Sequence, residues 1–272
     1  MNKDVNQKVL VLDIDGTLTN SDKVITEATR QGIINIQERG HIVILASGRP
    51  TPGMKKYAEE LELEKYGGYL LSFNGARITN CKTKEIIFQQ ALPSEVIPKI
   101  YQFAQKNDCG IITYIDNCII SGRRLDKYLE LESRINNLPL KQVNNFEEYQ
   151  KYDINKCLLT ADPELAVQYE KKLQEVFKGI LSIYRSEPFF IEVMPLNIDK
   201  ATSLDKMLAS VGLTRENAIC CGDGFNDMTM IQYAGLGVAM GNAQPAIKDA
   251  ADYITKSNDE DGIAHIIDKF IL

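Results

Sequence analysis

The chain has 272 residues, which at roughly 150 residues per domain is enough for one large domain or two modest ones. Its 31 Lys and Arg against 37 Asp and Glu give a net charge of −6, and 44% of the residues are hydrophobic. This composition excludes a mainly disordered chain and a basic nucleic-acid-binding surface. No apolar run reaches the ~18 residues that span a bilayer, and the N-terminus lacks a secretory leader. We therefore expect a cytoplasmic protein that binds neither nucleic acid nor membrane.

Histidine and cysteine are too sparse to carry most kinds of catalysis. The two histidines, His41 and His265, lie far apart in sequence and are expected to be structural. Neither stands beside a motif of a serine or cysteine hydrolase. The six cysteines show no Cys-x-x-Cys spacing and are expected to be free. The chemistry is therefore expected to rest on carboxylates.

The first third of the chain alternates between strand and helix patterns. A helix is expected between a Thr26 N-cap and Gly40, and a second helix is expected with Thr51 as its N-cap and Pro52 as its first residue. The expected strands are 8–15, 41–47 and 68–76. Alternation of this kind predicts right-handed βαβ crossovers and a parallel sheet.

The pattern changes near residue 82, where two short β runs have the spacing of a hairpin. From there to about residue 190 the chain is an α+β mixture rich in antiparallel pairs, and after Pro195 the βα alternation returns. The sequence predicts an α/β protein with a doubly wound, Rossmann-like parallel-sheet core and an inserted α+β domain. The core comprises 1–82 and 190–272, and the inserted domain comprises 83–189.

Polar residues follow the expected core strands at the points where those strands end. The first strand runs into DIDGT at 13–17, the second into Ser47-Gly48-Arg49, and a later one into GDGFND at 222–227. Lys200 stands at the start of the preceding helix. Ligands of open α/β sheets bind at the carboxyl ends of the strands. These residues are therefore expected to form one site.

The residue types at this site point to phosphoryl transfer. Asp13, Asp15 and Asp223 brought together would crowd like charges, which requires a cation. Oxygen ligands without histidine or thiolate favour Mg²⁺. An ionised carboxylate can act as a nucleophile without a base to activate it, and a hydroxyl, a lysine and helix-start N–H groups complement a phosphoryl group.

Four segments in this order, DIDGT, ASGR, the lysine at 200 and GDGFNDMTM, resemble the motifs of the haloacid dehalogenase-like (HAD) hydrolase superfamily. Their order and spacing are similar to those of its Cof-type phosphatase branch. The resemblance implies a Rossmann-like core and an inserted cap domain of the α+β, C2 type. It also implies a phosphoric monoester hydrolase that forms an aspartyl-phosphate.

The resemblance implies a role for each matching residue. Asp13 would be the nucleophile, and Asp15 the general acid and base. The Mg²⁺ ligands would be Asp13, Asp15 through its backbone carbonyl, and Asp223. The phosphoryl group would be bound by Ser47, Lys200 and Asn226. Supporting positions would be Asp227, Gly16, Thr17 and Gly48, and substrate contacts would include Arg49, Asn74 and Gly75.

Several alternatives stay open at this point. A phosphomutase and a catalytically silent phosphate-binding protein share the same fold, whereas a dinucleotide-binding module fits poorly because Gly235 and Gly237 precede an apolar run. The expected partner is a small phosphorylated metabolite, sugar phosphates foremost, and the oligomeric state is open. Five residues of the inserted domain are either substrate contacts or ordinary packing residues: Tyr114, Arg123, Arg124, Tyr184 and Arg185.

Overall fold

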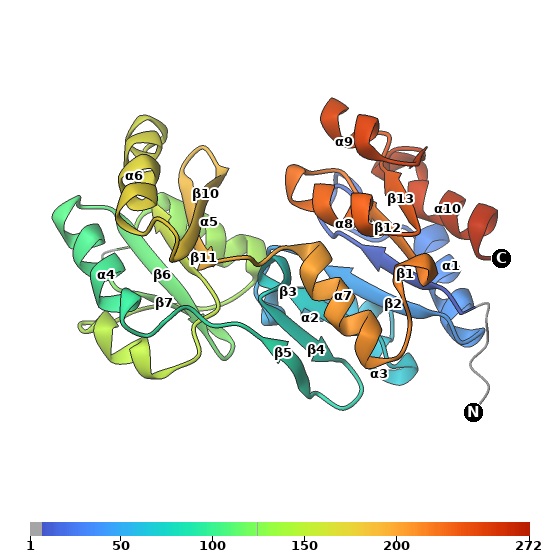
Figure 1. Cartoon of the computed structure of the whole chain (residues 1–272), viewed down its shortest axis with the longest axis horizontal. Coiled ribbons are helices and arrows are strands. Elements are labelled where there is room, and N and C mark those ends of the chain that lie inside the picture. Colours follow the sequence, from blue (N-terminus) through green and yellow to red (C-terminus); the bar gives the residue numbers. More distant parts are fainter. Residues whose placement is uncertain (1–6, 124) are drawn as a thin grey trace. The chain divides into compact units, whose positions relative to one another are not determined.

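A computed structural model describes residues 7–123 and 125–272 and divides the chain into two compact units (Figure 1). The first unit comprises Met1–Phe88 and Asp199–Leu272, and the second comprises Gln89–Ile198. Both divisions fall later than the boundaries expected at 82 and 189. The reason is strand pairing: β5 (Ile86–Gln89) is the edge strand of the first unit's sheet, and β11 (Phe190–Pro195) pairs within the second.

In the described part of the chain, the first unit contains an eight-stranded sheet in the order β14-β13-β12-β1-β2-β3-β4-β5. The further strands are β1 (Val9–Leu12), β2 (Ile42–Ala46), β3 (Tyr69–Ser72), β4 (Arg77–Asn80), β12 (Ala218–Gly222), β13 (Leu236–Ala239) and β14 (Tyr253–Ile254). Strand β1 pairs in parallel with both β2 and β12, and β3 and β4 form an antiparallel hairpin. The sheet therefore joins both ends of the chain, coloured blue and orange to red in Figure 1.

Helices cover both faces of this sheet, which confirms the doubly wound architecture (Figure 1). One face packs against α1 (Glu27–Glu38), α2 (Lys55–Glu60), α3 (Leu63–Tyr66), α9 (Pro245–Ala250) and α10 (Gly262–Phe270). The other packs against α7 (Lys200–Ser210) and α8 (Met228–Tyr233). Residues of β1 alternate between the two faces, and all four are completely buried. Such a continuous apolar strand is typical of a parallel sheet buried on both sides.

Local sequence explains where the first helices begin. The Thr26 side chain accepts the N–H of Thr29 at 3.3 Å, which confirms the expected N-cap of α1. The N-cap expected at Thr51 is wrong, because this residue opens a 3₁₀ turn, Thr51–Met54, and α2 starts only at Lys55. The hydroxyl of Thr51 instead shares a 2.7 Å hydrogen bond with the Ser72 hydroxyl at the end of β3.

The second unit, over its described residues, has a six-stranded sheet in the order β10-β11-β9-β6-β7-β8. Its further strands are β6 (Gly110–Ile115), β7 (Cys118–Ser121), β8 (Leu140–Gln142), β9 (Cys157–Thr160) and β10 (Leu181–Glu187). Pairing is antiparallel except between β7 and β8. Helices α4 (Val96–Lys106) and α6 (Pro163–Val176) share one apolar cluster with this sheet. Helix α5 (Lys127–Asn136) contacts it through Tyr114.

The six cysteines, all of them within the described residues, are free thiols. Among the described helices, none combines the length and the apolar character that crossing a membrane requires.

Candidate active site

The central strands of the first unit deliver aspartates to one edge of the sheet. Asp13 and Asp15 follow β1, and Asp223 follows the neighbouring β12. Strands β1 and β12 are neighbours in the sheet. On the β1 side the next strands are β2 and β3, and on the β12 side they are β13 and β14, so successive strands are added in opposite directions from this point. Such a point of reversal is where doubly wound sheets bind ligands. From the sequence, we expected the residues that follow the core strands to lie at one edge of the sheet, and the structure places them there.

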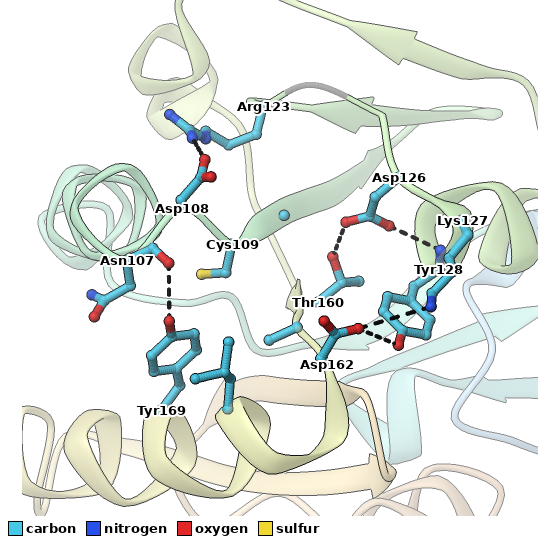
Figure 2. Close-up of a pocket in the computed structure, with 13 residues that line it drawn as sticks. Asn107, Asp108, Cys109, Arg123, Asp126, Lys127, Tyr128, Thr160, Asp162 and Tyr169 are labelled. Atoms are coloured by element: carbon cyan, nitrogen blue, oxygen red, sulfur yellow. Dashed lines mark hydrogen bonds and ion pairs between the residues drawn. The ribbon is translucent and has the colours of Figure 1, made fainter.

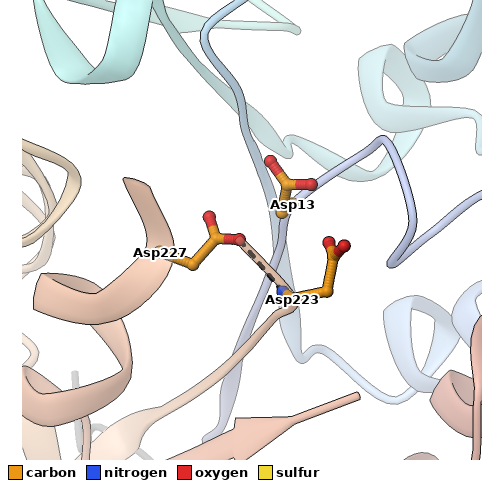
Figure 3. Close-up of side chains that lie close together, drawn as sticks. All are labelled: Asp13, Asp223 and Asp227. Carbon is orange, nitrogen blue, oxygen red and sulfur yellow. Dashed lines mark hydrogen bonds between the residues drawn. The ribbon is translucent and has the colours of Figure 1, made fainter. Parts of the chain in front are cut away.

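Asp13, Asp223 and Asp227 form a compact acidic cluster (Figure 3). A carboxylate oxygen of each lies within 4.8 Å of one from the others. Burial, followed by the charge of Asp227, raises the pKa of Asp13 to about 8, against the opposing effect of Lys200. Burial also raises the pKa of Asp223 to about 6. A set of hard oxygen donors whose charged forms are disfavoured in this way fits a divalent cation such as Mg²⁺.

Lys200 is a buried cation at the centre of this cluster. Its Nζ donates to Asp13 Oδ1 at 2.7 Å, to Asp227 Oδ1 at 2.6 Å and to the Ala46 carbonyl at 2.7 Å. Burial acts to lower the pKa of Lys200, but the two carboxylates hold it above its ordinary value. The side chain is placed by Asp199, which accepts the N–H of Thr202 at 2.7 Å and starts α7 at Lys200.

Asp227 orders the loop that carries Asp223. Its Oδ2 accepts the backbone N–H groups of Asp223 and Gly224, each at 3.0 Å. It lies in a 3₁₀ turn, Phe225–Asp227, that precedes α8, and its side chain is fully buried. With Oδ1 on Lys200 and Oδ2 on the backbone, Asp227 positions the other members of the cluster.

Asp223 is held from the other side by the turn after β1. Thr17 Oγ1 donates to Asp223 Oδ1 at 2.9 Å. Gly16 has φ +85°, and a Cβ atom at this position would lie 2.5 Å from Asp223 Oδ2. This turn therefore requires glycine both for its backbone conformation and for the close approach of the carboxylate.

The carboxylate of Asp15 lies outside the acidic cluster. It accepts Arg49 Nε at 2.7 Å and Nη2 at 2.9 Å, and Lys23 Nζ at 3.1 Å. Burial acts to raise the pKa of Asp15, but Arg49 and Lys23 hold it below its ordinary value. Lys23 was missed at the sequence level because it stands in a turn, with φ +60°, and belongs to no motif.

The remaining expected residues line the loops after β2, β3 and β12. Ser47 Oγ accepts the N–H of Arg49 at 3.2 Å, and the Ser47 carbonyl accepts the N–H of Asn74 at 2.9 Å. Asn226 Nδ2 donates to Asn74 Oδ1 at 3.3 Å. A Cβ at Gly48 would lie 3.2 Å from that same Asn74 oxygen. The three loops are therefore in direct contact.

Gly75 connects these loops to the helix that carries Lys200. Its carbonyl accepts the Ser203 hydroxyl at 2.7 Å, and Ser203 is completely buried in α7. Ser203 was not predicted, because one serine inside a helix carries no signal of its own. The contact fixes the start of α7 against the end of β3.

The five open residues of the inserted segment and the two histidines have mostly structural partners. The Tyr114 hydroxyl donates to Glu132 at 2.6 Å inside the second unit, and Arg185 pairs with Glu170 at 2.7 Å. Arg123 pairs with Asp108, Tyr184 lies in β10, and Arg124 falls outside the described residues. His41 Nδ1 accepts the N–H of Lys8 at 3.1 Å, and His265 lies 3.1 Å from the Tyr253 hydroxyl.

The second unit also contains a pocket of about 420 Å³ between the ends of α4, α5 and α6 (Figure 2). Its polar side chains bond one another. Asp126 accepts the Thr160 hydroxyl at 2.6 Å and caps α5, and Asp162 accepts the Tyr128 hydroxyl at 2.8 Å. These contacts stabilise the helix ends that form the pocket wall.

The doubly wound fold and a carboxylate site that contains a buried lysine are typical of a class of α/β enzymes with an acidic site at the edge of the sheet. Residues 10–267 match the model of the haloacid dehalogenase-like hydrolase family, which is more specific evidence than the fold and the site alone. The chain belongs to that family. This agrees with the resemblance seen in the four motifs.

Individual relatives support the class of phosphoric monoester hydrolase. The 5-amino-6-(5-phospho-D-ribitylamino)uracil phosphatase YcsE of Bacillus subtilis is 30% identical, over 99% of this chain and 98% of its own. A haloacid dehalogenase-like hydrolase from Bacteroides thetaiotaomicron is 44% identical with a TM-score of 0.93, over 97% and 99% of the two chains. The HAD subclass IIB sugar phosphatase BT4131 is 26% identical with a TM-score of 0.83, over 97% and 99%.

Proposed function

We propose that this protein is a Mg²⁺-dependent phosphatase that hydrolyses small phosphate monoesters, sugar phosphates foremost, through an aspartyl-phosphate on Asp13. The observation that carries the proposal is the environment of Asp13. It follows the central strand β1, its Oδ1 lies 2.7 Å from the buried Nζ of Lys200, and it belongs to a cluster of three carboxylates. A nucleophile for an anionic phosphoryl group needs nearby positive charge of this kind.

The metal would be held by the Asp13 and Asp223 carboxylates and the Asp15 backbone carbonyl. When bound, Mg²⁺ supplies positive charge that keeps the carboxylates ionised and neutralises phosphoryl oxygens. Lys200 places a second positive charge beside Asp13, and Ser47 and Asn226 would add hydrogen bonds to the phosphoryl group.

The reaction has two displacements at phosphorus. In the first, an Asp13 carboxylate oxygen forms a bond to phosphorus, the bond to the ester oxygen breaks, and that oxygen takes a proton from the Asp15 carboxyl. In the second, water attacks the aspartyl-phosphate, its proton passes to Asp15, and the bond between phosphorus and Asp13 breaks. Phosphate leaves, and both aspartates return to their starting states.

The activities of two relatives suggest two groups of candidate substrates. BT4131 is a sugar phosphatase, and YcsE acts on a phosphorylated ribityl chain attached to a uracil. Both substrates carry a phosphate monoester on a polyhydroxylated carbon chain. We propose sugar phosphates as the first candidates and the ribitylaminouracil phosphate as the second.

The test is a panel of phosphate monoesters assayed for released phosphate, with Mg²⁺ and with EDTA, and ranked by kcat/KM. The expected result is Mg²⁺-dependent release, fastest from a phosphorylated sugar or sugar alcohol. Isomerised ester without released phosphate would instead identify a phosphomutase. If no ester reacts with metal-replete protein, the chain is a silent binding protein and the proposal is wrong.

A further inference from the structure

The guanidinium of Arg49 binds the Asp15 carboxylate at two points. Nε lies 2.7 Å from Oδ2, and Nη2 lies 2.9 Å from Oδ1. The planar fork of donors matches the two oxygens, so it fixes the plane of the carboxylate as well as its distance. The Arg49 side chain is only 10% exposed, whereas that of Asp15 is 36% exposed. The more deeply buried Arg49 side chain therefore holds the more exposed Asp15 side chain.

Arg49 is itself held by three other parts of the first unit. Its N–H donates to Ser47 Oγ at 3.2 Å, and its carbonyl accepts the N–H of Phe73 at 2.9 Å. The guanidinium carbon lies 5.7 Å from the ring centroid of Tyr57, which is buried in α2. Arg49 therefore transmits the fixed geometry of β2, β3 and α2 to a carboxylate that follows β1.

Lys23 does not replace this function. Its Nζ lies 3.1 Å from Asp15 Oδ1, but the lysine side chain is 59% exposed. A flexible ammonium in solvent is a screened point charge with no directional preference for a carboxylate plane. The orientation of Asp15 therefore depends on Arg49.

We infer that Arg49 is a positioning residue for the acid–base chemistry of Asp15, rather than a primary ligand of the phosphoryl group. The inference rests on the proposed function. Asp15 must point one oxygen at the leaving group in the first displacement and at water in the second, and a rotated carboxyl can do neither.

The two roles of Arg49 predict different substrate dependence. A phosphoryl ligand acts on the part that all monoesters share, so its loss slows every ester equally. A residue that orients the general acid acts on the leaving group. An alkoxide must be protonated as it departs, whereas p-nitrophenolate is a weak base that leaves without a proton.

The experiment compares Arg49→Ala with the wild type on p-nitrophenyl phosphate and on an alkyl ester, the fastest of glucose 6-phosphate, fructose 1-phosphate and glycerol phosphate. We expect kcat/KM to fall about 100-fold for the alkyl ester and less than about 10-fold for p-nitrophenyl phosphate. Added guanidinium ion should restore part of the alkyl ester activity. Arg49→Lys keeps a cation near Tyr57, so it should fold even if Arg49→Ala does not. Its kcat/KM should also fall more for the alkyl ester than for p-nitrophenyl phosphate, but by smaller factors than in Arg49→Ala.

The control is Lys56→Ala, which removes another cation 5.5 Å from the Tyr57 ring without any contact to Asp15. Its kinetics should match the wild type on both esters. An equal loss on both esters in the Arg49 variants would overturn the inference and leave the phosphatase function intact. A wild-type protein that hydrolyses no ester would refute the proposed function instead.

Discussion

The Nζ of Lys200 lies 2.6 Å from Oδ1 of Asp227, and both side chains are excluded from solvent. Asp13 is a second anionic partner of the same ammonium, at 2.7 Å. A single buried cation therefore compensates two carboxylates that come from opposite ends of the chain. Because desolvated charges are costly when unpaired, this group links the geometry of the acidic cluster to the stability of the fold.

Lys200→Met should destabilise the protein by about 3–5 kcal/mol, because it leaves Asp13 and Asp227 buried without their cation. Urea unfolding measures the change. Adding Asp227→Asn to Lys200→Met removes one of the stranded charges and should recover about 1–3 kcal/mol. If the two changes prove simply additive, Lys200 and Asp227 are not energetically coupled.

Asp13→Asn should abolish turnover, lowering kcat by at least about 10³-fold, because an amide cannot attack phosphorus. Rapid acid quenching with radiolabelled substrate should trap phosphate on the wild type and not on the variant. Asp268→Asn, the same change at an exposed site on α10, is the control and should keep full activity. Undiminished turnover in Asp13→Asn would rule out an aspartyl-phosphate at this residue.

Thr17→Val should raise the Mg²⁺ concentration for half-maximal activity by roughly 10-fold, because the hydroxyl that orients Asp223 Oδ1 is lost. Asp223→Ala should weaken Mg²⁺ binding further, because it removes the carboxylate itself. Titration calorimetry with Mg²⁺ alone provides a readout that does not depend on turnover. Thr19→Val is the matched control, since this buried hydroxyl donates to the Ile14 carbonyl instead. A Thr17→Val protein with unchanged Mg²⁺ affinity would contradict the assignment of Asp223 as a ligand.

Comparing Gly16→Ala with Gly40→Ala separates the stability cost of an alanine at positive φ from the effect of displacing the Asp223 carboxylate. Both glycines have φ +85°, so either alanine should cost about 1–2 kcal/mol of stability. Only at position 16 does the new Cβ meet Asp223, and at position 40 there is nothing within 4 Å. Displacing that carboxylate should lower kcat/KM about 100-fold in Gly16→Ala and leave Gly40→Ala unaffected. Equal activity in the two variants would show that the turn tolerates a shifted Asp223.

Strand periodicity predicted most of the fold, and motif position placed the expected site residues at one edge of the sheet. Asp13 and Asp223 could be paired from sequence because parallel strands end on the same side of a sheet. Thr26 could be predicted as a cap because its bond is local. Each of these inferences needed only neighbouring residues or a rule of sheet topology.

The partners of Asp15 could not be predicted in this way. Its contact with Arg49 depends on how the loops after β1 and β2 turn, and its contact with Lys23 depends on a left-handed backbone conformation. Thr51 failed as a cap because a tertiary hydrogen bond to Ser72 replaced the local one. Long-range side-chain pairing of this kind leaves no periodic trace in the sequence.

The pairing of β1 with both β2 and β12 also has a consequence during synthesis on the ribosome. Val9 pairs with Ala218, about two hundred residues later in the chain. At ~5–20 residues per second, the strand that precedes Asp13 keeps one hydrogen-bonding edge unpaired for roughly 10–40 s. The last motif to emerge begins at the end of β12 and brings Asp223 to the sheet edge beside Asp13, while β13 and β14 are still to be added. A chain truncated before it would carry Asp13 on an open strand edge, prone to aggregation and unable to act on phosphorylated metabolites.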